Sequence, residues 1–327
     1  MARCQRHFFP VDDSKKYTNQ YRVCGSYPIF EAIGPTSLTR LLRQRRRGCV
    51  SIGTVKRTVQ QGAWLMKLAV LSDIHGNLVA LEAALADVEA AGPVDRIWVL
   101  GDLAAFGPRP QQCVQRIRDL ETARHAEHGK DSFAVISGNA DRYLVTGERF
   151  RITPPEDATG FESYLAGLQP RDDMLNWNTA QLDWESYDYL RQRLGRELYW
   201  EVPGYGGVIG YHAIPGDDES NALRPDTPDE EAADALLDRE GRLGIGGHTH
   251  LQMDRDLGRW RAINVGSVGF AFDQPGKACW GLFTFDDASS LNVDLRAVPY
   301  DVDAAIADLD AAGHPHPAWL ARKLKAS

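Results

Sequence analysis

From Met66 onward, short apolar runs alternate with stretches of helical periodicity, and this alternation limits the fold more than any other feature of the chain. Residues 67–72 form an apolar run, after which Leu78, Leu85 and Val88 recur at helical spacing. The same order of strand and helix then repeats with short connections. This order is typical of a largely parallel sheet with crossover helices.

Five strands are predicted in the first part of this region. They cover residues 67–72, 97–100, 133–137, 207–211 and 243–246. Residues 148–200 break the rhythm, and we interpret them as a cap inserted beside the sheet, with a helix over 179–194. Residues 260–300 alternate as antiparallel strands do, which predicts a second sheet. The simplest architecture is an α/β domain of two sheets flanked by helices.

The first 65 residues differ from the rest of the chain in charge. They carry twelve Lys and Arg against three Asp and Glu, whereas the remainder carries 25 basic and 42 acidic side chains. We interpret residues 1–65 as a disordered extension or as upstream sequence that is not normally translated. A nucleic-acid, membrane or organelle-targeting segment is the alternative. The folded domain is then 66–300, followed by a helical tail over 301–327.

Composition also limits the partners and the compartment. The acidic body argues against binding of long nucleic acids, although not of small nucleotides. The five cysteines show no spacing typical of a disulfide framework or a thiolate metal site. No segment approaches the roughly 18 consecutive apolar residues of a membrane span. The sequence therefore predicts a cytoplasmic protein that does not contact membranes.

Each predicted strand is followed by Asp, Asn or His side chains. In chain order these seven residues are Asp73, His75, Asp102, Asn139, His212, His248 and His250. Because the carboxyl ends of parallel strands line a common crevice, we expect the seven side chains to converge. Their donors are nitrogen and oxygen without sulfur, which fits two divalent cations such as Mn, Fe, Zn or Ni, with a carboxylate able to bridge them.

Local spacing sharpens this expectation. In Asp73-x-His75, alternate side chains of an extended strand end leave the same side of the backbone and can reach one ion. The pair in His248-x-His250 can do likewise, or can divide between two ions. A glycine precedes three of the seven residues and allows close approach of the backbone at each strand end.

The motifs "SDIHGN", "GDLAAFGPRP", "GNAD", "GHTH" and "INVGSVG" resemble the successive motifs of the calcineurin-like metallophosphoesterases. The resemblance extends from about residue 66 to residue 300 and is strongest to the small prokaryotic branch of that superfamily. It implies a four-layer α/β/β/α sandwich of two mixed sheets with flanking helices, and metal-dependent hydrolysis of phosphoester bonds. Residues 1–65 and much of 148–200 are not covered.

Carried over residue by residue, the resemblance gives each of the seven side chains a role. It assigns the first ion to Asp73, His75 and His250, the second ion to Asn139, His212 and His248, and the bridge to Asp102. Mn is the preferred metal, with Fe, Zn or Ni as alternatives. The implied nucleophile is a hydroxide that bridges the ions, while the metals neutralise charge on the phosphoryl oxygens.

One motif position departs from the family pattern. Many members carry a histidine after Gly-Asn, placed to donate a proton or hydrogen bond at the phosphate, and this chain has Ala140 there. A methyl group cannot donate a proton, so the general acid is unassigned. Help of that kind is worth about 10² to 10⁴ in rate, and its loss affects poor leaving groups most. His125 and His128 are candidates only because nothing in the sequence excludes them.

Four further residues are expected near the cleft, as substrate or supporting contacts. They are Asn77, Asp141, Arg142 and Ser267. For Asn77 and Ser267, which belong to motifs, a structural role is an equal alternative. Arg142 can either reach a phosphate or form an ordinary surface ion pair.

The leading hypothesis is a phosphoesterase acting on a small phosphoester, with a slight preference for small-molecule or nucleotide diesters, which need less leaving-group protonation. The alternatives are a phosphomonoesterase, including a serine/threonine protein phosphatase with a phosphoprotein substrate, and a metal-binding regulatory protein that has lost catalysis. A nucleotide-binding domain without metal is disfavoured, because no Gly-x-Gly-x-x-Gly or Walker-type loop follows the first strand.

Overall fold

The computed structural model describes residues 65–286 and 289–325, and all statements below refer to these residues. Over these ranges the chain forms ten strands and eight α-helices, and the strands make two five-stranded sheets. The predicted basic extension, residues 1–65, lies outside the described residues except for Leu65, which begins the first strand.

The first sheet has the strand order β10-β9-β1-β2-β3. Its strands are β1 (Leu65–Leu71), β2 (Arg96–Val99), β3 (Phe133–Val135), β9 (Lys277–Asp286) and β10 (Leu291–Pro299). β1, β2 and β3 are parallel, whereas β9 runs antiparallel to β1 and β10 to β9. Side chains along β1 alternate between two cores: Leu68 and Val70 lie in one cluster, and Ala69 and Leu71 lie in another.

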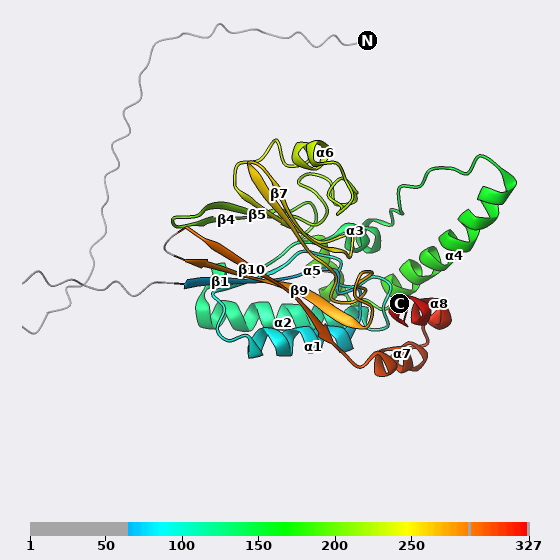
Figure 1. Cartoon of the computed structure of the whole chain (residues 1–327). Helices are drawn as coiled ribbons and strands as arrows, with labels where there is room; N and C mark the ends of the chain where they lie inside the picture. The colour runs from blue at the N-terminus through cyan, green and yellow to red at the C-terminus, as the bar shows by residue number, and fades with distance from the viewer. Residues whose placement is uncertain (1–64, 287–288, 326–327) are drawn as a thin grey trace, which may run out of the picture. The chain divides into compact units, whose positions relative to one another are not determined.

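The cluster that contains Ala69 and Leu71 joins the first sheet to its helices. These helices are α1 (Leu78–Ala90), α2 (Pro110–His128), α3 (Asn139–Thr146) and α5 (Trp184–Arg191), with a short 3-10 turn (Lys130–Ser132) before β3. Figure 1 shows α1 and α2 on the face of this sheet that is turned away from the second sheet. α2 begins with Pro110, whose fixed φ suits the first turn of a helix.

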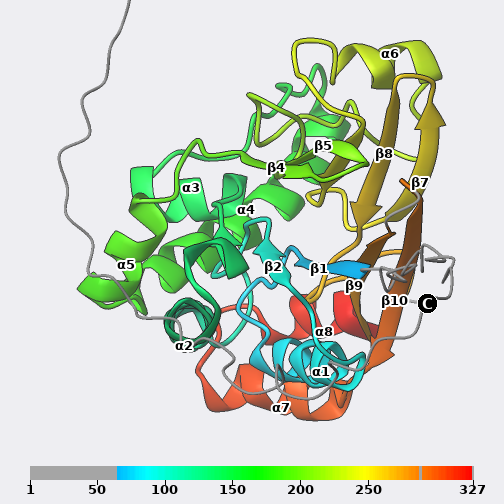
Figure 2. The same ribbon diagram turned by 90° about the vertical axis from the view of Figure 1, so that its left-hand side faces the viewer.

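The second sheet has the strand order β4-β5-β6-β8-β7. Its strands are β4 (Leu198–Val202), β5 (Gly206–Gly210), β6 (Leu243–Gly246), β7 (Gln252–Leu257) and β8 (Trp260–Val265). The cluster around Leu68 and Val70 includes residues of both sheets and fills the space between them. A third cluster packs the other face of the second sheet against α6 (Asp229–Asp234) (Figure 2). The result is the expected α/β/β/α order of layers.

The prediction that the strands after residue 260 form the second sheet together is wrong. β8 lies parallel to β6 in the second sheet, whereas β9 and β10 extend the first sheet beside β1. The run from Ala278 to Phe283 is buried without a break, which is typical of a central strand covered on both faces rather than of a half-exposed edge.

The single helix predicted over 179–194 is also wrong. The chain forms α4 (Ala158–Ala180), and then α5 starts after Asp183, whose side chain accepts a hydrogen bond from the Ser186 N–H. α4 has already ended at Ala180, and this N-cap begins a separate helix. The first half of α4 is largely exposed and projects from the body of the protein (Figure 1).

Two helices, α7 (Val302–Ala311) and α8 (Pro317–Lys325), follow the last strand. Leu320 and Leu324 of α8 are buried in a fourth cluster together with Phe270, from the loop after β8. The tail therefore packs beside one of the loops that follow the strands. None of the helices in the described ranges is both long and apolar enough to cross a bilayer.

Candidate metal centre

The candidate site lies where strands of both sheets end. The structure joins all seven predicted side chains there through a continuous set of contacts. They are Asp73, His75, Asp102, Asn139, His212, His248 and His250. Six of the seven are buried, and only His248 is partly exposed. Convergence at the strand ends therefore holds, although the residues come from loops far apart in the sequence.

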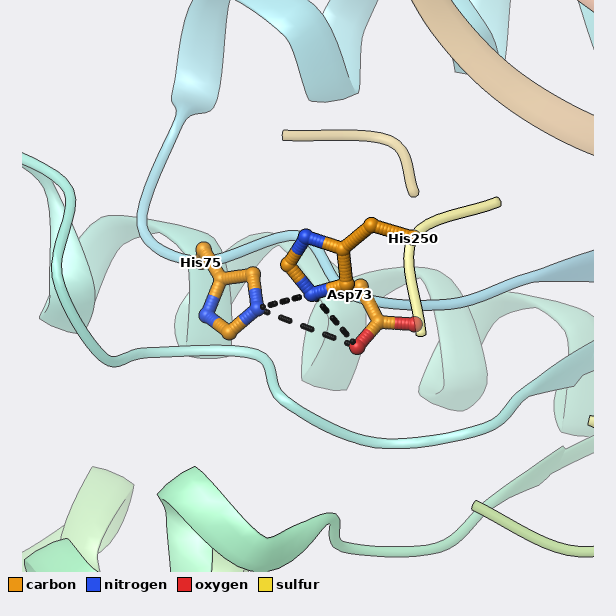
Figure 3. Close-up of side chains that lie close together, drawn as sticks. All are labelled: Asp73, His75 and His250. Atoms are coloured by element: carbon orange, nitrogen blue, oxygen red, sulfur yellow. Dashed lines mark hydrogen bonds and ion pairs between the residues drawn. The ribbon is translucent and has the colours of Figure 1, made fainter. Parts of the chain in front are cut away.

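Asp73, His75 and His250 form a first group, in which the candidate ligand atoms all lie within 4.8 Å of one another. Nε2 of His250 lies 3.0 Å from Nε2 of His75 and 3.2 Å from Oδ1 of Asp73. Figure 3 shows the two ring nitrogens and the carboxylate oxygen directed toward one another. This is an arrangement that a single cation can occupy.

A second group consists of Asp73, Asp102 and His212. Oδ2 of Asp102 lies 3.4 Å from Nε2 of His212 and 3.6 Å from Nε2 of His75, so this carboxylate reaches both groups. Oδ1 of Asn139 lies 3.0 Å from Nε2 of His212 and 3.0 Å from Nδ1 of His248. The second group is thereby extended by an amide oxygen and a further imidazole.

Backbone carbonyls fix the tautomer of three of the histidines. Their Nδ1 atoms face carbonyl oxygens, in the pairs His75 with Ala105 at 3.2 Å, His212 with Leu100 at 2.7 Å and His250 with Phe270 at 2.8 Å. Because a carbonyl oxygen can only accept, Nδ1 carries a proton, and the lone pair of each ring lies at Nε2 when that ring is neutral. The Nε2 atoms of His75 and His250 then face each other as two acceptors, which a cation between them stabilises.

Asp73 carries a second sign of a cation site. Its Oδ1 atom is fully buried and accepts no hydrogen bond, while its Oδ2 atom accepts one from the His248 N–H. Burial opposes ionisation, but the surrounding histidines, with His250 foremost, hold the pKa of Asp73 well below its usual range. A buried carboxylate oxygen without a donor is costly unless a cation contacts it, so the residues present fit a metal.

The histidines differ in charge for physical reasons. Burial lowers the pKa of both His75 and His248 to about 4, so these rings are neutral and available as ligands at neutral pH. Burial opposes the charge of His212 too, but the carboxylate of Asp102 outweighs it and raises the pKa of His212 to about 10. A metal bound at Nε2 of His212 would displace this proton.

The backbone at the site corrects one prediction. Asp73, His75, His248 and His250 do not continue extended strands, because their φ angles are 56°, 51°, 67° and 59°, all in the left-handed region. Asp102 shares this conformation, with φ of 54°. Such angles are uncommon for residues other than glycine and cluster at functional sites. Sharp local turns, not strand alternation, place these side chains: Asp73 and His75 lie in one group with His250, whereas His248 contacts Asn139.

Close backbone approach explains two of the glycines. A Cβ atom at Gly138 would lie 2.5 Å from Cε1 of His212 and closer still to Oδ1 of Asp102. A Cβ atom at Gly247 would lie 2.7 Å from the Cβ of Ser72. Both distances are too short for a side chain, so the site can close only around glycine.

Asn77 and Ser267 support the loop that carries Asp73. Asn77 caps α1 by accepting from the Ala80 N–H and donates from Nδ2 to the Gly269 carbonyl at 3.1 Å. The Ser267 hydroxyl donates to the Asp73 carbonyl at 2.8 Å. Both residues are buried, and their contacts hold the first strand end against the loop after β8.

Asp141 and Arg142 also have structural partners. Asp141 accepts hydrogen bonds from the backbone N–H groups of Leu103 and Gly138, and burial, reinforced by the charge of Asp102, raises its pKa to about 7. The guanidinium of Arg142 forms ion pairs with three carboxylates, those of Glu148, Asp218 and Glu219. Arg142 thus shows the ion pairing that was the alternative to a phosphate contact.

Ala140 is buried, and its methyl group belongs to the hydrophobic core below the first sheet. Its backbone N–H donates to Oδ1 of Asp102 at 2.8 Å. The position after Asn139 therefore orients a carboxylate through its backbone. His125 is not a substitute acid, since its Nε2 contacts the carbonyl of Phe133 at the start of β3, at the opposite end of that strand. His128 lies on the same last turn of α2.

A cleft of about 490 Å³ opens over the site and is lined by His75, Asp102, Asn139, His248 and His250. Basic and aromatic side chains that sequence reasoning missed also line it. Among them are Arg151, Arg171, Arg224, Lys323, Phe272 and Trp319. They come from the predicted insert, the tail and the long loops, where no motif distinguishes them from ordinary surface residues.

Carboxylates and histidines gathered at the strand ends of a four-layer α/β sandwich define a class, that of the dinuclear metallohydrolases. The family model that describes the calcineurin-like phosphoesterase superfamily domain matches residues 66–288, and the chain belongs to this family. It is accordingly a metal-dependent phosphoester hydrolase with a candidate dinuclear site.

Relatives differ in how much of their length is shared. The chain is 28% identical over 275 residues to an uncharacterised protein of Methanocaldococcus jannaschii, covering 79% of this chain and 96% of that protein. It is 34% identical over 143 residues to the symmetrical bis(5'-nucleosyl)-tetraphosphatase of Pectobacterium atrosepticum. That match covers 42% of this chain and 46% of the relative, less than half of either.

Two solved structures share the fold over most of the chain. A metallophosphoesterase from Sphaerobacter thermophilus is 25% identical with a TM-score of 0.56, covering 80% of this chain and 98% of that one. A hypothetical protein from Pyrococcus horikoshii OT3 is 22% identical with a TM-score of 0.62, covering 79% and 97%. The two mixed sheets of this chain are thus the architecture of its family.

Proposed function

We propose that the chain hydrolyses phosphodiester bonds of small nucleotides with the help of two divalent ions. The observation that carries this proposal is the pair of facing Nε2 acceptors on His75 and His250, beside the buried Oδ1 of Asp73 that accepts no hydrogen bond. In the proposal the first ion is held by Asp73, His75 and His250, the second by Asn139, His212 and His248, and the bridge is Asp102.

Mn is the metal we propose, with Fe, Zn and Ni as the alternatives to be tested. The two groups offer only imidazole nitrogen, carboxylate oxygen and amide oxygen, a set that suits first-row divalent metals and lacks the thiolates that favour soft ions. Cys113 and Cys279 are free and buried. A cytoplasmic location is part of the same proposal, because the five cysteines show no spacing typical of a disulfide framework.

The backbone of the chain holds two of the candidate ligands, Asp73 and Asp102, in fixed positions. When bound, two such ions lower the pKa of a coordinated water and neutralise phosphoryl oxygens. The Ala140 N–H holds Oδ1 of Asp102, and the His248 N–H holds Oδ2 of Asp73. Each carboxylate therefore has one oxygen tied to the backbone and the other directed to the site, which is the rigidity that positioning requires.

The preference for diesters rests on the leaving group and on the cleft. The position where many members carry the histidine that donates to the phosphate is occupied by the buried Ala140, so esters that need little protonation are favoured. The cleft offers basic groups that suit a phosphate, and the aromatic rings of Phe272 and Trp319 suit the base of a nucleotide. The bis(5'-nucleosyl)-tetraphosphatase relative also supports a nucleotide substrate by its name, although the match covers less than half of that protein.

The test compares two chromogenic substrates. The full-length chain is stripped of metal, reloaded with Mn, and assayed on bis-p-nitrophenyl phosphate and on p-nitrophenyl phosphate, with Asp102→Asn as the inactive control. Asp254→Asn is the matched control, because Asp254 pairs with Arg261 on the second sheet and does not line the cleft. Parallel reloading with Fe, Zn and Ni ranks the metals.

We expect faster hydrolysis of the diester, retained in Asp254→Asn and lost in Asp102→Asn. Faster hydrolysis of the monoester would replace the proposal with a phosphatase and would require another proton donor. Metal binding without turnover on either ester would contradict it, and would favour a metal-binding protein without catalysis.

A further inference from the structure

The part of the cleft lining that we call the wall is built from separate segments of the chain. Arg171 comes from α4, Arg224 from the loop before α6, and Trp319 and Lys323 from α8. Arg151, from the loop before α4, completes the set of four basic side chains. A substrate whose scissile phosphate lies at the metal ligands would extend toward this wall.

Two of these four basic groups have carboxylate partners in the described part of the chain, and two do not. Arg151 forms ion pairs with Asp217 and Glu219, and Arg224 forms one with Asp226. Within the described ranges, Arg171 and Lys323 form no hydrogen bond or ion pair through their charged ends. Both side chains are exposed at the cleft.

Aromatic rings hold these two cations without neutralising them. The guanidinium carbon of Arg171 lies 5.3 Å from the ring centre of Phe150, and Nζ of Lys323 lies 5.6 Å from that of Trp319. Phe150 and Trp319 line the same cleft. A cation over a ring keeps its hydrogen-bond donors free, so it is oriented and still able to bind a phosphate.

The wall is also fixed relative to the site. Nε2 of His316, just before α8, contacts Oδ2 of Asp173 on α4 at 2.9 Å. Nε2 of His314 contacts the carbonyl of Phe106 at 2.7 Å, and Oδ1 of Asn178 accepts from the N–H of the same Phe106. The ring of Phe106 lies 5.4 Å from that of His75. α4 and α8 are thus tied to each other and to the loop beside a candidate ligand.

From this placement we infer that Arg171 and Lys323 form a subsite for a second phosphoryl group of the substrate. The inference rests on the proposed function and narrows the substrate class to nucleotides that carry at least one phosphate beyond the scissile one. The aromatic rings beside the two cations give the subsite an apolar floor that a base or ribose can contact.

The test measures binding directly, so that it does not depend on turnover. Calorimetric titration of the full-length, Mn-loaded chain with ADP and with AMP gives the ratio of the two affinities. The variants are Arg171→Gln and Lys323→Gln, which remove the charge and keep most of the side chain. Arg322→Gln is the matched control, since Arg322 is the basic residue next to Lys323 on α8 and does not line the cleft.

We expect the native chain to bind ADP more tightly than AMP. Each of the two variants should lower ADP affinity about tenfold, the loss typical of a hydrogen bond to a charged group, and should leave AMP affinity nearly unchanged. Arg322→Gln should change neither. An equal affinity for ADP and AMP in the native chain, or an ADP preference that survives both substitutions, would overturn the inference.

The two proposals fail in different ways. If ADP binding depends on Arg171 and Lys323 but neither chromogenic ester is hydrolysed, the subsite stands and the catalytic proposal falls. If diester hydrolysis is robust and the variants bind ADP as the native chain does, the catalytic proposal stands without the subsite.

Discussion

Gly138→Ala adds one methyl group beside two of the candidate ligands, His212 and Asp102. The added Cβ would lie 2.5 Å from Cε1 of His212 and closer still to Oδ1 of Asp102. Gly138 has φ of -99° and ψ of -174°, an extended conformation that alanine adopts without strain. Any effect of the substitution therefore comes from steric overlap of the added methyl group and not from backbone strain.

The size of the displacement follows from the same distance. Ordinary contact with a Cβ begins at 3.4 Å, so His212 and the carboxylate of Asp102 must each move by about 1 Å. A misplacement of this size in a catalytic group typically costs about 10²-fold in rate. We expect a loss of about that size in diester hydrolysis and a weaker second ion, with the first group of ligands retained.

The assay pairs rate with metal content. Hydrolysis of bis-p-nitrophenyl phosphate and the number of Mn ions per chain are measured for Gly138→Ala and for Gly167→Ala, where no atom lies within 4 Å of the added Cβ. Thermal melting checks that both variants are folded. Native rate and metal content in folded Gly138→Ala would refute the reasoning that this glycine makes room for the ligands.

Three further predictions concern residues around the site and the scaffold. Asp141→Ala removes the carboxylate that holds backbone N–H groups of two site loops, so Mn affinity in a calorimetric titration should fall about 10 to 100-fold. Arg142→Gln removes a cation that pairs with three carboxylates, of which Glu219 keeps Arg151 as a second cation, and urea unfolding should show a loss of about 1 kcal/mol with diester hydrolysis nearly unchanged. Hydrogen bonds from Arg296 and Trp280 lower the pKa of Asp87, so its stabilising effect is present above its ordinary value of 3.8 and is lost as pH falls below it. The difference in melting temperature between the native chain and Asp87→Asn should shrink over that range, and a difference that stays constant would contradict this.

Most strands and the candidate ligands could be predicted from the sequence because both depend on local signals, whereas β4 and β7 were not predicted. An apolar run followed by Gly-Asp or Gly-Asn indicates a buried strand with a polar group at its end. The carboxyl ends of parallel strands lie at the same edge of the sheet, so these polar groups come together. The candidate ligands can be located in this way although His250 lies far along the chain from Asp73. The fold of their loops was not predictable by alternation, because it depends on left-handed backbone angles at Asp73, His75 and Asp102.

Neither the pairing of distant strands nor the residues that form the wall of the cleft could be predicted from the sequence. The run from Ala278 to Phe283 resembles any other hydrophobic strand, and only its contacts with β1 place it in the first sheet. Arg171 and Lys323 carry no pattern either. Both line the cleft because α4 and the end of the chain lie side by side, for example through His316 and Asp173. A side-chain contact between residues 143 positions apart has no local signature.

The most direct test of the account is the metal content of the full-length chain after reloading with Mn and dialysis. Two ions per chain are expected in the native protein. His250→Ala should lose the first ion and Asn139→Ala should weaken the second, because each removes one side chain from one proposed ligand set. A native chain that retains no Mn, or the same content in all three proteins, would contradict the proposal that these strand ends hold two metal ions.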